Sequence, residues 1–151
     1  MATKNRQKKA QMKSLLKAPE VQTWRAIMSA FQVTLSKLEK GLMEDGLHVS
    51  RFQILFYLYF EGSLSAVELS RKLLVTRGNI STFLKRLEND EQIKICSSSP
   101  SKGRPLYCLT PSAERFFEEI FPKHVKRVKQ YVPRFPKDLQ KFLEALSKQD
   151  T

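Results

Sequence analysis

The sequence has few residues that could bind a metal or form disulfides. It contains only two cysteines and two histidines, and no two cysteines have CxxC spacing. A four-ligand zinc site would need carboxylates in addition, so we expect neither a metal nor a cofactor. The scarcity of cysteine also favours reduced thiols and a cytoplasmic location.

Long apolar runs are missing as well. The longest, Ile54 to Phe60, includes two tyrosines and is far shorter than the ~18 residues that a membrane span requires. No apolar signal-peptide stretch follows the basic N-terminus. We therefore expect no membrane segment, and the run is typical of a buried helix.

Acidic residues are also scarce. The chain has 15 Asp and Glu against 27 Lys and Arg, a net charge of +12. Such an excess favours a polyanionic partner, because neutralising phosphates releases bound counterions. An anionic membrane surface would satisfy the charge equally well. A length of 151 residues with 41% hydrophobic content fits one domain, or a small domain whose helical extensions pair with a second copy.

The first 47 residues fall into two segments. Residues 1–18 are basic and contain too few apolar residues to fold, which predicts a flexible arm or a tail that only aids solubility. In residues 19–47, apolar residues recur at steps of three and four from Val21 to Leu42, the pattern of an amphipathic helix. We interpret this segment as a dimerisation helix, broken near Gly46.

Local signals in residues 48–75 predict two helices. Ser50 and Gln53 have the spacing of a capping box, and Gly62 is placed as a helix C-terminal glycine. Ser65 and Glu68 form a second capping box. It opens a short helix over residues 66–74 whose expected inward positions are Val67, Leu69, Leu73 and Leu74.

A second short helix and a hairpin follow. Thr76 can cap the helix, and its expected inward residues are Ile80, Phe83, Leu84 and Leu87. Residues 93–96 and 106–109 alternate in polarity around the basic loop SSSPSKGRP, as in a β-hairpin. A polar helix backed by apolar residues, followed by a basic hairpin, is typical of a winged helix-turn-helix that binds the major groove of DNA.

Residues 111–151 predict two more dimerisation helices. Thr110 and Pro111 provide a cap and a first helical position, and Pro122 is expected to kink or interrupt this helix before its end near Val132. Pro136 begins a last amphipathic helix. The predicted class is α+β, mainly α: a winged helix-turn-helix over residues 48–110 with N- and C-terminal dimerisation helices.

These residues resemble a known family. The stretch LSAVELSRKLLVTRGNISTFLKRLEND, the hairpin ending RPLYCLT and the helix after it are similar to the multiple-antibiotic-resistance regulators (MarR family). The similarity runs from about Trp24 to Val132. The resemblance implies a bacterial, homodimeric transcription factor that represses a near-palindromic promoter site and is released by a small aromatic ligand or by thiol oxidation. The recognition helix would be residues 76–87 and the wing tip residues 97–105.

The sequence departs from the family pattern at three places. Ser101 and Lys102 replace the acidic residue that usually precedes the wing arginine, here Arg104. Glu91 stands where a glycine commonly ends the recognition-helix segment, and Ala113 stands near another common glycine.

The candidate DNA-binding residues belong to three groups. Arginine can contact guanine and asparagine adenine through two hydrogen bonds, so Arg77 and Asn79 are candidates for base contact or, alternatively, for phosphate contact or capping. We expect Arg104 and Lys102 of the wing to enter an A·T-rich minor groove or to touch the backbone. The remaining candidates on the recognition helix are Thr76, Ser81, Thr82 and Lys85. Ser65, Arg71 and Lys72 are candidates for contact with the DNA backbone.

Two further hypotheses concern regulation. A pocket for a small aromatic effector would be lined by Trp24, Phe31, His48, Phe52 and Phe56, although such aromatic residues are more often core. Cys96 and Cys108 lie symmetrically about Lys102, so in a regular hairpin they would face each other and could form a redox switch, or simply pack as reduced thiols. We interpret His124 as an interface residue.

The favoured function is sequence-specific binding of double-stranded DNA by a homodimeric repressor. Two alternatives remain: a non-specific architectural protein of the nucleoid, which the charge and basic arm favour, and a winged-helix protein-interaction module. No carboxylate pair or Ser/His/Asp grouping indicates catalysis, so we do not expect an enzyme.

Overall fold

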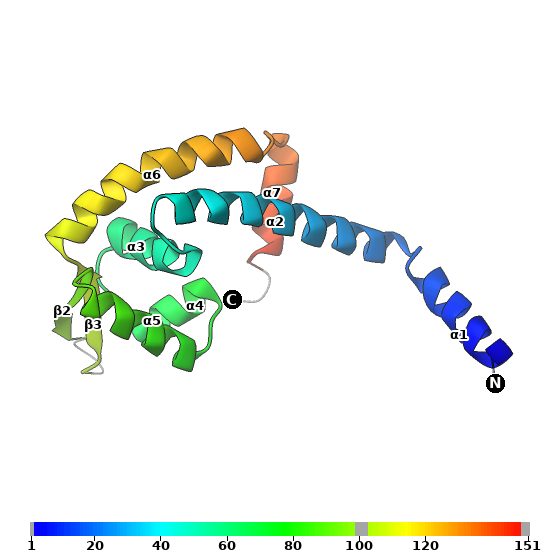
Figure 1. Cartoon of the computed structure of the whole chain (residues 1–151), viewed down its shortest axis with the longest axis horizontal. Coiled ribbons are helices and arrows are strands. Elements are labelled where there is room, and N and C mark those ends of the chain that lie inside the picture. The colour runs from blue at the N-terminus through cyan, green and yellow to red at the C-terminus, as the bar shows by residue number, and fades with distance from the viewer. Residues whose placement is uncertain (1, 99–102, 149–151) are drawn as a thin grey trace. The chain divides into compact units, whose positions relative to one another are not determined.

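The computed structural model describes residues 2–98 and 103–148 of the chain (Figure 1). Its elements, in chain order, are α1 (Ala2–Leu15), α2 (Pro19–Glu44), α3 (Val49–Glu61), β1 (Leu64–Ser65), α4 (Ala66–Leu73), α5 (Arg77–Asn89), β2 (Ile93–Ser98), β3 (Pro105–Leu109), α6 (Pro111–Tyr131) and α7 (Lys137–Leu146). They belong to two compact units, residues 1–37 and 38–151. In the described ranges, no helix combines the length and apolar character needed to cross a bilayer.

The N-terminal segment is helical where an arm without structure was expected. Helix α1 covers residues 2–15, and its side chains from Arg6 onward are exposed. The segment consists largely of Ala, Lys, Gln, Arg and Met and contains no glycine or proline, so its intrinsic helix propensity is high even without a core. The expectation that this segment would not fold considered only the packing of apolar side chains and omitted intrinsic helix propensity. Flexibility of the segment stays a prediction.

The core of residues 38–151 is built around α3, as its apolar run predicted. Ile54 and Leu55 are fully buried, and Phe52 and Leu58 are nearly so. The core is completed by α4, α5, α6 and the sheet, which contribute Leu69, Ile80, Leu84, Leu87, Ile93, Leu109, Ala113, Phe117 and Ile120. Helices α3, α4 and α5 therefore share one core with α6 and the sheet, and Figure 1 shows these elements together.

Three of the predicted helix ends are confirmed. Ser65 and Glu68 make both hydrogen bonds of a capping box at α4, Thr76 caps α5, and Gly62 ends α3 with a φ of 81°. The capping box predicted at Ser50 is wrong, because α3 begins earlier and its N-cap is His48, which makes no side-chain cap bond. The 3-residue spacing of Ser50 and Gln53 falls inside the helix.

Leu74 is not an inward residue. Helix α4 ends at Leu73, and Leu74 adopts a left-handed conformation with a φ of 53°. Its side chain is 92% exposed. The sequence spacing placed Leu74 on the apolar face, but that spacing applies only while the helix continues.

Pro122 does not interrupt α6. The helix runs as one element from Pro111 to Tyr131. Proline has a φ compatible with a helix and removes one backbone hydrogen bond, from its own position to the Glu118 carbonyl. Both Pro122 and Glu118 are exposed, so water can bond that carbonyl and the helix persists.

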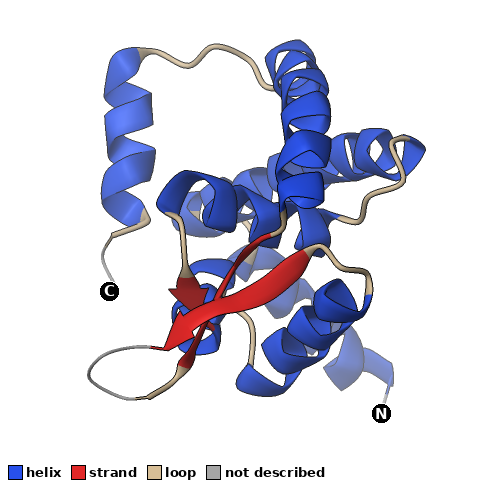
Figure 2. Cartoon of the chain, turned by 90° about the vertical axis from the view of Figure 1, so that its left-hand side faces the viewer, coloured by secondary structure: helices blue, strands red, loops and turns tan. Residues whose placement is uncertain are grey.

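The sheet is small and antiparallel, with strand order β1-β3-β2. Strands β2 and β3 form the predicted hairpin (Figure 2). Ile93 pairs with Leu109 and Ile95 with Tyr107, but the register then shifts, so that Ser97 pairs with Leu106. This irregularity leaves Cys96 without a paired residue, and a regular hairpin with opposed cysteines is therefore wrong.

Candidate nucleic-acid interface

Helix α5 has one apolar and one polar face. Ile80, Leu84 and Leu87 are buried at spacings of four and three residues, which fixes the rotation of the helix about its axis. The Thr76 hydroxyl accepts a hydrogen bond from the backbone N–H of Asn79 at 3.3 Å and so fixes its start. All six candidate residues of this segment are exposed: Thr76, Arg77, Asn79, Ser81, Thr82 and Lys85.

Two hydroxyls on the polar face are already oriented. Ser81 Oγ donates to the Arg77 carbonyl at 2.9 Å, and Thr82 Oγ1 donates to the Gly78 carbonyl at 3.1 Å. Because each hydroxyl proton is used within the helix, the oxygens are left as hydrogen-bond acceptors. In a DNA groove such acceptors match the amino groups of adenine and cytosine.

The three candidate contacts with the DNA backbone, at the N-cap of α4 and within α4, differ in how available their side chains are. Arg71 is exposed. Lys72 pairs with Glu61 at 2.6 Å and lies 5.3 Å from the Tyr57 ring centre, and the hydrogen bond with Glu61 raises the pKa of Lys72. Ser65 is buried, and its hydroxyl bonds Glu68. Arg71 is thus the most available of the three for a phosphate.

In the wing, Arg104 is exposed and follows Gly103, whose φ of 59° is a left-handed turn conformation. Lys102, with the wing tip from residue 99, lies outside the described residues. The wing strand also exposes Ile95, which is 55% exposed although the alternation predicted an inward residue. Its partner Tyr107 is half-buried.

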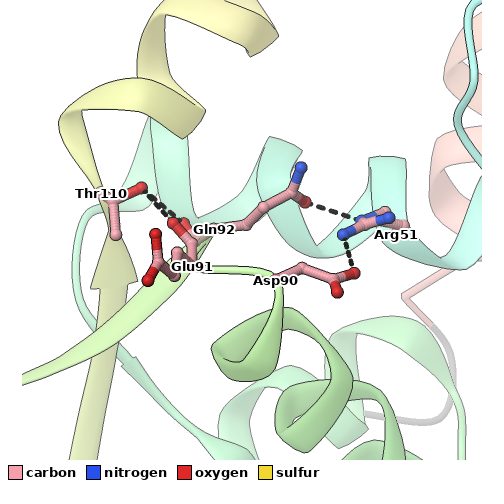
Figure 3. Close-up of polar contacts among 5 residues, drawn as sticks. All are labelled: Arg51, Asp90, Glu91, Gln92 and Thr110. Carbon is pink, nitrogen blue, oxygen red and sulfur yellow. Dashed lines mark hydrogen bonds and ion pairs between the residues drawn. The ribbon is translucent and has the colours of Figure 1, made fainter.

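A polar network joins the end of α5 to two other helices (Figure 3). Arg51 of α3 forms an ion pair with Asp90 and donates to the Gln92 side chain at 2.7 Å. The Thr110 hydroxyl, at the start of α6, donates to the Glu91 carbonyl at 2.8 Å. Glu91 itself has a φ of 53°, which explains why a glycine is common there.

Sequence reasoning did not find this network. Arg51 and Asp90 are 39 positions apart, and periodicity reports only which face of a helix is apolar. The one local sign of this network in the sequence was Glu91, which stands where the family commonly has a glycine.

The predicted effector-pocket residues come from both compact units of the chain, and their joint pocket stays a prediction. Trp24 and Phe31 belong to the N-terminal unit and are 63% and 57% exposed. Phe52 and Phe56 pack in an aromatic cluster with Phe117, whose ring centre is 5.7 Å from that of Phe52. Their side chains therefore act as core in this structure.

His48 lines a different cavity, of about 540 Å³. This cavity lies among the end of α2, the start of α3 and the second half of α5. Arg51, Arg86 and Asp90 also line it.

His124 packs against Phe52, with 4.3 Å between the ring centres. Within the described part of the chain, its Nδ1 atom is buried without a hydrogen-bond partner. Burial lowers the pKa of His124, and the nearby Arg127 lowers it further. The neutral ring thus serves as packing, and a role at a subunit interface stays a prediction.

The cysteines are free thiols. Cys96 donates to the Leu106 carbonyl at 3.4 Å. Burial raises the pKa of the Cys108 thiol to about 11, and its hydrogen bond with Cys96 acts in the same direction. A protonated thiol is a poor nucleophile, so this geometry favours reduced packing over a redox switch. Across residues 2–98 and 103–148 no cluster of three His, Cys, Asp or Glu could hold a metal.

Comparison with known proteins gives a family match and a similar relative. A family model of the winged helix DNA-binding domain matches residues 50–132. The HTH-type transcriptional regulator YkoM of Bacillus subtilis, itself uncharacterised, is 24% identical over 126 residues, covering 83% of this chain and 81% of that protein.

Two solved structures extend the similarity. Sco3205, a MarR family transcriptional regulator from Streptomyces coelicolor in complex with DNA, has a TM-score of 0.73 and 25% identity, over 87% of this chain and 85% of that one. NadR in complex with 4-hydroxyphenylacetate has a TM-score of 0.69 and 20% identity, over 83% of this chain and 92% of that one.

Proposed function

Because the chain belongs to the winged helix DNA-binding family, as a transcriptional regulator of the MarR type, we propose that it is a homodimeric repressor of a near-palindromic promoter site. The observation that carries this proposal is the geometry of α5. Its buried face and Thr76 cap hold a polar, basic face toward solvent, as major-groove reading requires.

The DNA-contacting residues have separate roles in this proposal. Arg77 and Asn79 contact base edges, with Ser81 and Thr82 as hydrogen-bond acceptors for amino groups. Lys85 and Arg71 neutralise phosphates, and Arg104 enters the neighbouring minor groove. Lys72 contributes less, because Glu61 already neutralises it.

A second copy of the chain would cover the apolar side chains that the terminal helices leave exposed. Trp24 and Phe31 of α2 and Phe142 of α7 are each more than half exposed. Apolar patches of this kind usually mark protein interfaces. In a dimer with two-fold symmetry, two copies of α5 would enter successive major grooves about 10 base pairs apart.

Repression would follow from occupying the promoter, and a small ligand or another signal would release it. The complex of NadR with 4-hydroxyphenylacetate supports a ligand of small aromatic type. A bacterial cytoplasm is the expected location, since the target is chromosomal DNA.

A non-specific architectural role is the second candidate. The net charge of +12 and the exposed basic helix α1 favour it. Such a protein would bind duplexes with a steep salt dependence and little sequence preference.

The test is selection of bound duplexes from a randomised pool at about 0.15 M salt. We expect an enriched inverted repeat. A pool with no shared motif would favour the architectural role, and no recovered DNA would refute both.

Two variants sharpen the test. Arg77→Ala should weaken binding to the selected site by about 1–3 kcal/mol and relax the preference at one base pair per half-site. Arg134→Ala removes another exposed arginine, outside the winged part, and should keep the site preference. Equal effects of the two variants would contradict base reading by Arg77.

A further inference from the structure

Leu74 combines a backbone conformation and an exposure that both disfavour leucine. It follows α4 in the turn that leads to α5 (Figure 1), and its φ of 53° lies in the left-handed region that glycine adopts without strain. Its side chain is 92% exposed, whereas the next most exposed large apolar side chain among the described residues, Trp24, is 63% exposed. Packing and backbone geometry would both be better served by a glycine at this position.

Gly78 shows the opposite mismatch. It lies in the first turn of α5, where no positive φ requires a glycine. A Cβ atom added there would have no neighbour within 4 Å, so packing within the described chain does not require a glycine either. Alanine has a higher helix propensity. An open glycine in a helix is explained where another molecule approaches the backbone closely.

Both positions lie at the N-terminal end of α5, the end that contacts base edges in a helix-turn-helix. Leu74 precedes the cap residue Thr76 by two positions, and Gly78 follows it by two. Between Glu68 and Glu88 the sequence contains five basic residues and no acidic one. These surroundings favour a polyanion over an apolar protein surface as the molecule that meets this end of α5.

The turn that carries Leu74 is held in one conformation by two hydrogen bonds. The backbone N–H of Leu74 donates to the Arg71 carbonyl at 3.2 Å, and that of Val75 donates to the Ser70 carbonyl at 3.0 Å. These bonds fix where the Leu74 side chain begins relative to α5. A contact made by this side chain therefore needs little further ordering of the backbone.

We propose that Leu74 contacts the C5-methyl group of a thymine in the major groove, and that Gly78 allows the first turn of α5 to approach the duplex closely. This inference rests on the proposed function, since it requires α5 to read the major groove. The thymine methyl is the apolar group that the major groove presents. Leu74 is then a specificity-determining residue that favours thymine at one position of each half-site, in addition to the hydrogen bonds of Arg77 and Asn79.

The stability of the fold and the affinity for DNA should change in opposite directions. Leu74→Gly relieves the left-handed strain, and Gly78→Ala raises helix propensity while keeping the carbonyl that Thr82 bonds. Both variants should melt at a higher temperature than the natural chain. On the selected site, Leu74→Gly should bind about fourfold more weakly per half-site, the equivalent of one buried methyl group. Gly78→Ala should bind about tenfold more weakly, because its added methyl group meets the duplex.

Uracil in place of thymine identifies the methyl contact. Each thymine of the selected site is replaced in turn by uracil, which lacks only the C5-methyl group. At one position of each half-site, uracil should weaken binding of the natural chain about fourfold and leave binding of Leu74→Gly unchanged. Leu74→Met, which keeps an apolar side chain, is the matched control and should retain the preference for thymine. Fluorescence anisotropy at constant salt measures these affinities.

The outcomes separate this inference from the proposed function. If the natural chain selects no motif, both are overturned. A selected motif that the natural chain, Leu74→Gly and Gly78→Ala bind equally well overturns this inference alone. The same holds if Leu74→Gly loses equal affinity for the thymine and uracil duplexes at every position, because that loss would not depend on a methyl group. Lower melting temperatures for both variants would also overturn it, since the two residues would then serve the fold.

Discussion

The winged body, residues 38–131, and the terminal helices use their apolar residues in opposite ways. In the winged body, Leu55 and Phe117 are 0% and 1% exposed. On the outer helices, Trp24 of α2 and Phe142 of α7 are 63% and 57% exposed. The winged body therefore completes its own core, whereas the terminal helices carry exposed apolar side chains, which a second copy of the chain would cover in the proposed dimer.

The largest expected effect is a direct test of that difference. Leu55→Ala should lower the free energy of unfolding by about 2–5 kcal/mol, because it leaves a cavity in a closed core. Phe31→Ala removes a side chain that is 57% exposed and should change the stability of the monomer little. Urea unfolding measures both.

Protein concentration distinguishes the two variants further. If a second copy covers α2, the unfolding midpoint of the natural chain rises with protein concentration. Phe31→Ala should flatten that dependence, and Leu55→Ala should shift the midpoint at every concentration. A loss of stability in Phe31→Ala that does not depend on concentration would argue against a dimer through α2.

Gly41 marks the point at which α2 joins the winged body. A Cβ atom there would overlap Cδ of Arg127, and Arg127 forms an ion pair with the largely buried Asp45. Gly41→Ala should therefore displace Arg127 and cost about 1–3 kcal/mol, despite the higher helix propensity of alanine. Adding Arg127→Ala to Gly41→Ala creates space, so the second substitution should then cost less than it does alone. Additive costs in this double-mutant cycle would refute the clash.

A substitution at Glu91 tests whether its backbone conformation lowers the stability of the winged body. It is a non-glycine residue with a φ of 53°, a conformation that costs about 1–2 kcal/mol for side chains with a Cβ atom. Glu91→Gly keeps the backbone carbonyl that Thr110 bonds, so the melting temperature should rise. Glu119→Gly, at an exposed position inside α6, should lower it. A fall in both would contradict the assignment of strain to Glu91.

The smallest expected effect concerns the stability of the fold at acidic pH. A hydrogen bond from Arg127 lowers the pKa of Asp45 below its usual value of 3.8. The charged carboxylate is thus favoured in the folded state, and its stabilisation is present above pH 3.8 and lost as the pH falls through the lowered pKa. Asp45→Asn should be less stable than the natural chain near neutral pH, and the gap should close in acid. A gap that stays constant down to pH 2 would contradict this.

The sequence predicted those features that depend on local pattern. Ser65 with Glu68, and Thr76, identify helix starts because their hydrogen bonds span three residues. The rotation of α5 followed from Ile80, Leu84 and Leu87. Periodicity therefore sufficed to name the exposed residues of α5 that are candidates for DNA contact.

Features that depend on tertiary geometry could not be predicted. The register shift at Cys96 involves both strands of the hairpin, so symmetry about Lys102 gave the wrong pairing. The cavity depends on residues such as Glu39 and Arg86, which come from helices far apart in the chain. The aromatic residues Phe52 and Phe56 of α3 were predicted to line a pocket, but in the structure they pack against Phe117 in the core.

The close approach of Gly41 and Arg127 also has an evolutionary consequence. A side chain at position 41 would displace the end of a long side chain at position 127. The two positions should therefore change together. In chains descended from a common ancestor, an alanine or larger residue in place of Gly41 should be accompanied by a shorter residue in place of Arg127, and then by relaxed selection on the acid at Asp45.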